Sequence, residues 1–317
     1  MQAPSTSSRP SARRRRRLPE GGPGDGRRVL LTGATGLVGQ RLLPQLLQRG
    51  WHVVAVGLRR QDPEVVPGTI RLTADLRESG WQRWCAGCSA VLHLAGILEE
   101  NPRSGDTFTA AHLQVTRNVV AACTQSGMDR LVMLSALGAP ESSTAFHRSK
   151  LRAEEVLHQS GLRWTVVRIP PLFGPGDHWS APLARALARL PIFPVSGDGG
   201  TALQLMAVEE LVPVLLDALE QPVIAGDTIE VGGPEVLTYR EVVRRTAAAT
   251  GTRFRPAFLT PRMARWILPM AARLARTPLT QGPLELLQSS AVVSSGRPTG
   301  PEHAGLRRYE GPTWLAG

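Results

Sequence analysis

The chain has 317 residues, of which 42% are hydrophobic, and it carries a formal net charge of +11. This length suits one large domain or a domain with a smaller lobe, and the hydrophobic share supports a substantial core. No segment reaches the roughly 18 apolar residues of a membrane span. The three cysteines are irregularly spaced, which argues against a disulfide framework and favours a reducing, cytoplasmic compartment.

An arginine-rich segment opens the chain. Residues 1–26 are rich in Ser, Pro, Gly and Arg and offer little apolar surface to bury, so we expect them to be disordered. No apolar segment follows the arginine run, which argues against a secretory signal. The composition overlaps with that of organelle transit peptides, although it lacks a clear amphipathic helix. A solvated tail, a misplaced start codon, and electrostatic contact with anionic lipid or nucleic acid all stay open.

Short apolar runs alternate with helical patterns through the first half of the chain. The runs predict buried strands at 28–32, 52–58, 69–73, 90–94, 130–134 and 163–168. Apolar residues at helical spacing predict helices at 37–49, 107–126 and 147–159. Strands that alternate with helices predict an α/β fold, a doubly wound parallel Rossmann sheet covered on both faces. Such sheets bind ligands at the carboxyl ends of their strands.

The pattern loosens after Pro170, where Pro, Gly and short apolar runs dominate. We expect residues 27–170 to form the nucleotide-binding Rossmann core. Residues 171–317 are expected to complete the sheet and to form a small C-terminal lobe on the substrate side. The further elements predicted in this region are helices at 208–219 and 239–250 and a strand at 228–231.

One later segment mixes apolar residues with arginines. Residues 262–276 contain Trp266, Ile267, Leu268 and Met270 among several arginines, a pattern that predicts an amphipathic basic helix. We expect its apolar side to pack against the core, with contact with a membrane surface as the alternative.

A glycine-rich turn follows the first predicted strand and precedes the first predicted helix. Its glycines have the spacing Gly-x-x-Gly-x-x-Gly, which permits a tight bend and lets the backbone approach a pyrophosphate. The N-terminus of the following helix offers free N–H groups and the positive end of its dipole. In this strand–turn–helix context the pattern is specific for a dinucleotide. The turn residues predicted to bind it are Gly33, Thr35, Gly36, Leu37, Val38 and Gly39.

The end of the second predicted strand bears on the choice of cofactor. An Asp or Glu about 20 residues after the turn would bind the ribose 2′-hydroxyl of NAD. The chain has Arg59 and Arg60 at this point, and its next acid is Asp62. Arginine can pair with a 2′-phosphate and stack on adenine. We therefore favour NADP(H) over NAD(H), although the arginine-rich composition alone would also supply an exposed pair.

Lys150 is the only lysine in the chain. Arginine can replace lysine wherever charge alone matters, but it cannot supply a compact ammonium with three rotatable donors. Lys150 is therefore a candidate for chemistry.

A pair of cysteines has the spacing of a redox motif. Cys85 and Cys88 are separated by two residues, but they precede a predicted strand and do not open a helix after one. No second Cys or His pair completes a metal site. We predict neither a redox nor a metal site at this pair.

Motifs in a fixed order resemble the short-chain dehydrogenase/reductase superfamily, in its extended and atypical, NAD-dependent epimerase/dehydratase-like branches. These are residues 32–39, 75–76, 93–96, 134–136 and 149–150. Later segments look like the branch that contains the NAD(P)-binding accessory subunit of mitochondrial complex I and its bacterial relatives. Those segments are residues 112–119, 135–139, 164–168, 173–177 and 231–234. The likeness covers residues 28–250.

The resemblance assigns roles to residues outside the turn. It implies that Asp75 and Leu76 flank the adenine, and that Ala95 and Gly96 line the ribose on the nicotinamide side. Lys150 would hydrogen-bond the hydroxyls of that ribose.

The resemblance also defines the catalytic region. Ser135 would stand where the family has its substrate-orienting hydroxyl, and Pro170 would border the nicotinamide. The family's catalytic tyrosine lies four residues before the lysine, where this chain has Phe146. A tyrosine there supplies the proton for carbonyl reduction, which phenylalanine cannot do. His147 is adjacent but is a poor substitute, because consecutive helical side chains point about 100° apart, and we expect it to be satisfied or exposed.

Two classes of function stay open. The first is a binding or assembly protein that holds NADP(H), with weak or altered catalysis. Its partner would be a respiratory complex, a quinone-synthesis assembly or an anionic membrane surface, which would make it peripheral at the inner face of the membrane. The second is an active NADP-dependent oxidoreductase or epimerase, in which Lys150 positions the cofactor and Ser135 or a bound water delivers the proton. Nucleic-acid binding is not favoured, because no aromatic-interleaved basic patch or reading helix supports it.

Overall fold

The computed structural model describes residues 27–58, 67–140, 144–190, 192–221, 226–260, 262–263, 266–267, 270–271, 287, 289–294 and 306–315. Its centre is a seven-stranded sheet in which every neighbouring pair of strands is parallel. In spatial order the strands are β11 (Asp227–Glu230), β6 (Arg163–Ile169), β5 (Arg130–Ala136), β4 (Ala90–His93), β1 (Arg28–Thr32), β2 (His52–Gly57) and β3 (Thr69–Thr73). The predicted doubly wound parallel sheet is confirmed. The strand order reverses beside β1, and crevices at such points bind ligands.

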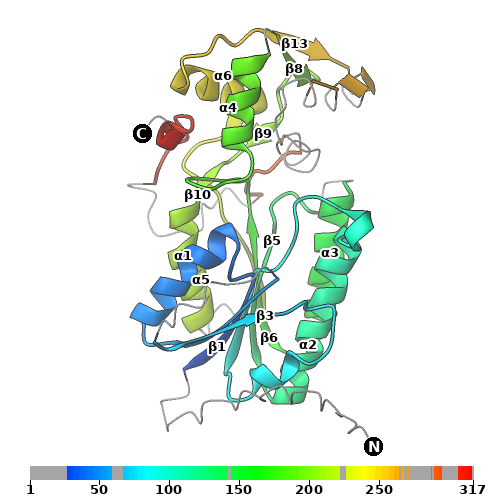
Figure 1. The fold of residues 1–317 in the computed structure, drawn as a ribbon, viewed down its shortest axis with the longest axis vertical. Coiled ribbons are helices and arrows are strands. Elements are labelled where there is room, and N and C mark those ends of the chain that lie inside the picture. Colours follow the sequence, from blue (N-terminus) through cyan, green and yellow to red (C-terminus); the bar gives the residue numbers. More distant parts are fainter. Residues whose placement is uncertain are drawn as a thin grey trace, which may run out of the picture.

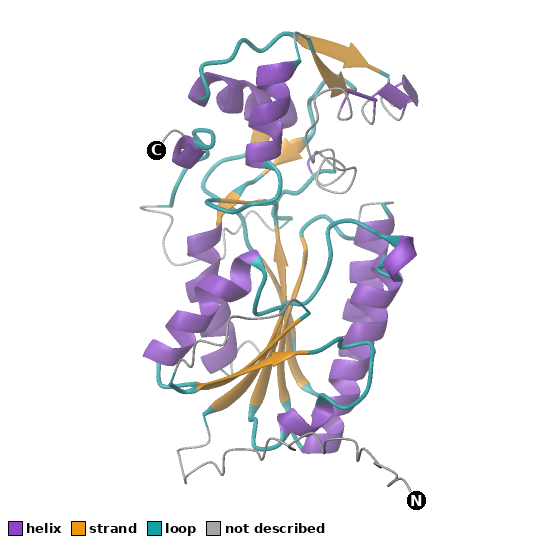
Figure 2. Cartoon of the chain, viewed as in Figure 1, coloured by secondary structure: helices purple, strands orange, loops and turns teal. Residues whose placement is uncertain are grey.

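Helices cover both faces of this sheet (Figures 1 and 2). α1 (Leu37–Gln48) and α5 (Val208–Glu220) pack on one face, and their apolar sides meet the strands in one large buried cluster. α2 (Val115–Ser126) and α3 (Ala145–His158) cover the other face over a second cluster. Strands buried on both sides explain the continuous apolar runs in the sequence. The predicted strand 228–231 is shifted by one residue, to β11.

The long helix predicted at 107–126 consists of two parts. Its first turns, η3 (Thr109–Gln114), are π-helical, and α2 begins at Val115. Single π-turns inside α-helices are often found at functional sites because they redirect side chains. Here η3 carries His112, which is buried and faces α3 through a hydrogen bond to Ser149.

A C-terminal lobe stands beyond the carboxyl ends of the sheet strands (Figure 1). It contains α4 (Ser180–Arg189), α6 (Tyr239–Ala249) and a parallel pair formed by β8 (Phe193–Ser196) and β13 (Pro256–Leu259). Its core is a separate apolar cluster. The short pairs β7–β10 and β9–β12 lie at its base; their bounds are Leu172–Phe173, Met206–Ala207, Ala202–Leu203 and Leu237–Thr238. The boundary at residue 170 stays a prediction, and α5 and β11, which follow it, belong to the layers of the sheet.

The apolar residues of the predicted amphipathic segment do not pack in the core, so that expectation was wrong for the described part. Residues 262–263, 266–267 and 270–271 are helical. The exposed fractions are 50% for Met263, 70% for Trp266 and 70% for Met270. None of the described helices is long and apolar enough to cross a membrane.

The described cysteines are free and buried. Burial raises the pKa of Cys85 to about 12 and that of Cys88 to about 11. Only the thiolate attacks alkylating agents, so we expect neither thiol to react with iodoacetamide at pH 8 in the native protein. Mass spectrometry of protein treated with and without denaturant would check this. Rapid labelling of either thiol in native protein would contradict the buried geometry.

Candidate dinucleotide site

The glycine turn joins the end of β1 to the start of α1. Gly33 has a φ of +69°, and a Cβ there would lie 2.8 Å from the backbone nitrogen of Ala95. A Cβ on Gly39 would lie 2.4 Å from the carbonyl oxygen of Gly33. Gly36 is the exposed N-cap of α1 and makes no side-chain capping bond. The first N–H groups of the helix lack intrahelical acceptors, so the turn offers bare backbone donors to an anion.

The side chains next to these backbone donors differ in their exposure. Thr35 and Leu37 are partly exposed, and Val38 is buried. Arg41, which no sequence motif marks, holds the start of α1 in place. Its guanidinium donates to the carbonyl oxygen of Leu37 at 3.0 Å and pairs with Glu209 at 3.1 Å. Such a contact across 168 residues has no local signal in the sequence.

Asp75 and Leu76 follow β3. The Asp75 carboxylate pairs with Arg77 at 2.6 Å, and the hydrogen bond from Arg77 holds the pKa of that carboxyl below its usual range. Arg77 also pairs with Asp106 at 3.1 Å. Leu76 is buried, and its carbonyl oxygen accepts a hydrogen bond from Asn118 at 2.9 Å. These contacts fix the backbone next to the position where the resemblance puts the adenine.

Lys150 lies on α3 against the loop after β4. A Cβ on Gly96 would lie 3.2 Å from Lys150 Nζ and 3.2 Å from His112 Nε2, so this position is crowded. Lys150 Nζ donates to the carbonyl oxygen of Leu134 at 3.4 Å, its one hydrogen-bond acceptor among the described residues. Burial lowers the pKa of Lys150 to about 8, against the opposing effect of Glu154. At neutral pH Lys150 is therefore a cation with donors left for a ligand.

Ser135 lies near the carboxyl end of β5, directly after Leu134. Its Oγ is buried and has no hydrogen-bond partner among the described residues. An unpaired buried hydroxyl costs free energy, so this atom is suited to a ligand or a water molecule. Ala95 is partly exposed after β4, and Pro170 is buried directly after β6. These residues thus occupy the ends of three neighbouring strands.

Phe146 occupies the position of the family's tyrosine, in the first turn of α3. Its ring is buried and makes edge contacts with three other rings. The centroid distances are 5.6 Å to Phe108, 5.4 Å to His112 and 5.3 Å to His147. An apolar aromatic cluster therefore stands where a proton donor is needed for carbonyl reduction.

The two histidines of this cluster are not acids at neutral pH. His112 Nδ1 lies 2.7 Å from Ser149 Oγ, and burial lowers its pKa to about 2. His147 Nδ1 lies 2.7 Å from Thr144 Oγ1, and burial lowers its pKa to about 4. Both rings are neutral and hydrogen-bonded, so His147 has a satisfied ring, in agreement with the expectation from the sequence.

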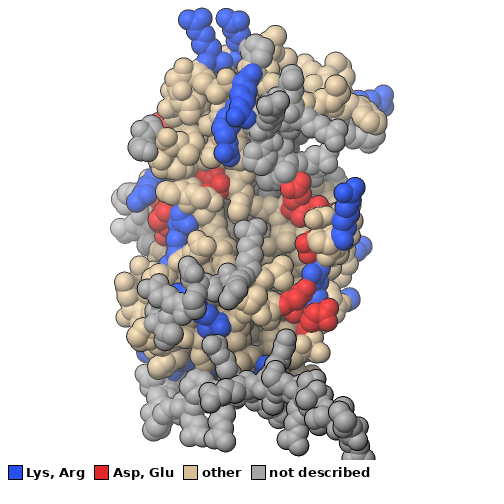
Figure 3. Space-filling view, in the orientation of Figure 1, with Lys and Arg blue, Asp and Glu red and all other residues tan. Residues whose placement is uncertain are grey.

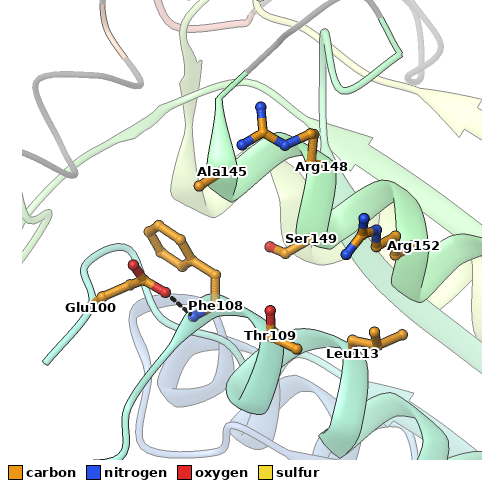
Figure 4. Close-up of a pocket in the computed structure, with 8 residues that line it drawn as sticks. All are labelled: Glu100, Phe108, Thr109, Leu113, Ala145, Arg148, Ser149 and Arg152. Atoms are coloured by element: carbon orange, nitrogen blue, oxygen red, sulfur yellow. Dashed lines mark hydrogen bonds between the residues drawn. The ribbon is translucent and has the colours of Figure 1, made fainter. Parts of the chain in front are cut away.

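A small pocket of 130 Å³ lies between η3 and α3 (Figure 4). Drug-sized ligands need roughly 300–1,000 Å³, so a dinucleotide does not fit here. None of the predicted cofactor-binding residues lines it. The lining residues are Glu100, Phe108, Thr109, Leu113, Ala145, Arg148, Ser149 and Arg152.

The predicted NADP determinants, Arg59 and Arg60, lie outside the described residues. Two observations indicate that the other predicted cofactor-binding residues fit a dinucleotide. A side chain at Gly33 or Gly39 would collide with the backbone, so only glycine fits there and the N–H groups of the turn are not covered by side chains at these positions. The buried Ser135 hydroxyl, which has no hydrogen-bond partner among the described residues, directly follows Leu134, whose carbonyl oxygen accepts from Lys150 Nζ.

The buried ammonium of Lys150 has a consequence for stability. Its folded-state pKa of about 8 lies below the ordinary value of 10.5, so the folded state holds the proton less well than the unfolded state. The cost of the buried charge is present below pH 8 and disappears as the pH rises towards 10.5. We expect Lys150→Met to raise the melting temperature at pH 7 by a few degrees and much less at pH 10. Scanning calorimetry at both pH values tests this, and an equal loss of stability at both would contradict it.

The NAD(P)H-binding family matches residues 33–177. This range runs from the glycine turn to the loop after β7 and contains every predicted site residue.

Curated relatives are 26–29% identical to this chain over the aligned residues. An uncharacterized protein of Mycobacterium tuberculosis is 28% identical over 84% of the chain, which spans only 27% of that relative's length. The ceramide reductase of Caulobacter vibrioides is 27% identical over 71% of each chain. The 2-alkyl-3-oxoalkanoate reductase of Stenotrophomonas maltophilia is 29% identical over 71% of this chain and 76% of its own.

Solved structures share the fold at low identity. The protein MoeE5 in complex with UDP-glucose and NAD has a TM-score of 0.63 at 22% identity, over 83% of this chain and 97% of its own. UDP-glucuronic acid 4-epimerase of Bacillus cereus, with UDP-glucuronic acid and NAD bound, has a TM-score of 0.64 at 18% identity, over 83% and 98%. These structures share the Rossmann-type fold with this chain, and the family match makes residues 33–177 similar to the NAD(P)H-binding family.

Proposed function

We propose that this protein binds NAD(P)(H) at the glycine turn and has weak or altered catalysis. The observation that supports this most directly is that the aromatic cluster around Phe146 stands where a proton donor is needed, while the glycine turn still offers its bare backbone donors. The glycine turn and α1 would hold the pyrophosphate, and Asp75 and Leu76 the adenine side. The bound dinucleotide would supply a hydride or accept one. The chain itself would orient it, through Ala95, Gly96 and Pro170.

A second candidate is an active reductase that uses Lys150 as its proton donor. Two named relatives are reductases, and the lowered pKa of Lys150 leaves an ammonium that gives up its proton near neutral pH. In such a reduction the carbonyl carbon receives the hydride, and the carbonyl oxygen receives a proton from Lys150. Ser135 Oγ would orient that oxygen. Lys150 would recover its proton from water.

The finer features of this function rest on the sequence alone. NADP(H) is favoured by Arg59 and Arg60, whereas the two solved structures described above contain NAD. The link to a respiratory or quinone-synthesis assembly follows from the resemblance to the complex I accessory subunit. Attachment at the inner face of a membrane is a prediction of the same kind.

Calorimetric titration of the full chain with NADPH and NADH in parallel tests the first proposal. We expect micromolar affinity, with NADPH bound about tenfold more tightly because of its 2′-phosphate. Absence of binding for both would overturn the proposal and the second candidate with it.

Single-turnover oxidation of bound NADPH, with a 3-oxo ester or a short-chain quinone, separates the two candidates. Slow oxidation that Lys150→Met leaves unchanged would support the binding protein. Rapid oxidation that Lys150→Met abolishes would support the reductase. Because NADPH absorbs near 340 nm, the reaction can be followed directly in either case.

A further inference from the structure

Glu154 places a carboxylate inside the protein. Figure 3 shows acidic and basic side chains at the surface, where water screens their charges. The side chain of Glu154 is 0% exposed, so its charge is not screened in this way. A buried carboxylate stays ionised only where nearby groups compensate for its lost hydration.

Arg168 on β6 supplies this compensation. Its guanidinium donates to both carboxylate oxygens of Glu154, from Nε to Oε1 at 3.2 Å and from Nη2 to Oε2 at 2.7 Å. Nη1 donates to Glu230 Oε1 at 3.2 Å, at the end of β11. Glu230 also accepts from the backbone N–H of Ser294 at 2.8 Å. Arg168 is therefore held by two carboxylates, and its bidentate pair fixes the orientation of Glu154.

Lys150 lies one helical turn before Glu154, on the same side of α3. Its Nζ donates to the carbonyl oxygen of Leu134 at 3.4 Å, and it forms no ion pair with any described residue. The Glu154 carboxylate therefore acts on the ammonium through space, in a region where water screens the attraction little. Burial lowers the pKa of Lys150 to about 8, and the negative charge of Glu154 opposes this effect.

The other charged and titratable groups around Lys150 do not replace Glu154. Two histidines lie near it, His93 on β4 and His112 on η3. Burial lowers the pKa of His93 to about 3 and that of His112 to about 2, and the charge of Lys150 adds to both effects, so both rings are neutral. Arg168, beyond Glu154, is a cation. Among the described residues, Glu154 is thus the anion that favours the protonated form of Lys150.

We propose that Glu154 is a positioning residue, which keeps Lys150 protonated and in place for a ligand at the dinucleotide site. Arg168 holds the carboxylate in one orientation, so its attraction for the ammonium has a constant direction. Without Glu154 the ammonium would release its proton more readily. The ligand of Lys150 rests on the proposed function, but the titration of Lys150 can be measured without a dinucleotide.

Nuclear magnetic resonance of protein made with isotope-labelled lysine tests the proposal. Because Lys150 is the only lysine, its side chain gives the one lysine signal, which reports its protonation directly. We expect this signal to titrate about one pH unit lower in Glu154→Gln than in the wild type. In Arg168→Gln it should titrate at a higher pH, because a neighbouring positive charge is lost. Loosened packing would not move the two halves of one ion pair in opposite directions.

Two further variants serve as controls. Glu154→Asp keeps the negative charge, so its Lys150 signal should titrate close to that of the wild type. Glu235→Gln breaks a different ion pair, in the C-terminal lobe, where Glu235 and Arg245 meet at 2.7 Å and each side chain is 19% exposed. It should lower the melting temperature and leave the titration of Lys150 unchanged.

An equal titration of Lys150 in Glu154→Gln and the wild type would overturn the proposal. A shift in the same direction in Glu154→Gln and Arg168→Gln would do so as well. If Glu154→Gln does not fold, Arg168→Gln still decides, since an unchanged titration there would contradict the action of these charges on Lys150.

The affinity for NADPH separates this test from that of the proposed function. We expect the affinity of the wild type to fall as the pH rises through about 8, where Lys150 loses its proton, and that of Glu154→Gln to fall at a lower pH. Absence of NADPH binding in every variant would overturn the proposed function. The titration of Lys150, measured without NADPH, would then still confirm or overturn the role of Glu154.

Discussion

Gly39→Ala is expected to abolish measurable dinucleotide binding and to lower the melting temperature. A Cβ at this position would lie 2.4 Å from the carbonyl oxygen of Gly33 and 2.7 Å from Cα of Ala34. Both atoms belong to the backbone, so no side chain can move aside to make room. The start of α1 would have to move away from β1, and the N–H donors would lose the geometry that holds a pyrophosphate. Calorimetric titration with NADPH, together with a thermal melt, measures both effects.

Gly36→Ala provides the informative contrast. Its Cβ would lie 3.2 Å from the carbonyl oxygen of Gly33, a contact that a shift of a few tenths of an ångström relieves. Because Gly36 is exposed at the N-terminus of α1, the added methyl group would obstruct the ligand more than the fold. We expect weaker binding at an almost unchanged melting temperature.

Gly161→Ala is the matched control for loss of a glycine. Gly161 has a φ of +71° with open space around it, so alanine there costs backbone strain but no collision. It precedes β6, at the opposite end of the sheet from the ligand. The melting temperature of the Gly161→Ala variant should fall, while its affinity for NADPH should stay constant. If Gly39→Ala bound NADPH as well as Gly161→Ala does, the turn would not be the binding site.

The sheet could be predicted from the sequence because its signals are local. Strands that are buried on both faces need continuous apolar runs, and β1 and β3 begin and end at the predicted residues. The glycine turn is equally local, since three glycines at fixed spacing follow directly after β1. The small differences occur at the ends of elements, where β5 and β6 extend beyond their apolar runs.

The features that could not be predicted depend on contacts between distant segments. The cluster around Phe146 brings together α3 and the start of η3, about 40 residues apart in the chain. Arg77 pairs with both Asp75 and Asp106, and so closes a loop that composition does not reveal. The pattern of residues 262–276 predicts packing against the core, because periodicity shows that a helix has an apolar side but not what covers it.

Phe146→Tyr is expected to raise the rate of single-turnover carbonyl reduction at least tenfold. The substitution adds a phenol one helical turn before Lys150, on the same side of α3. The ammonium of Lys150 would lower the pKa of that phenol, and a positioned proton donor typically contributes about 10²–10⁴-fold. NADPH affinity should not change, because the glycine turn and the ends of the strands are untouched. Stopped-flow absorbance with a 3-oxo ester as the acceptor measures the rate.

Phe108→Tyr is the control that adds the same hydroxyl to a different ring of the cluster. Phe108 is as buried as Phe146, but it lies beside η3 and not on α3, so its phenol has no lysine on the following turn. We expect no gain in rate from it. Combining Phe146→Tyr with Lys150→Met should remove most of the gain, since the two groups act together and their effects are not additive. A gain of equal size from Phe108→Tyr would mean that any hydroxyl in the cluster suffices. The position of the phenol one helical turn before Lys150 would then not matter.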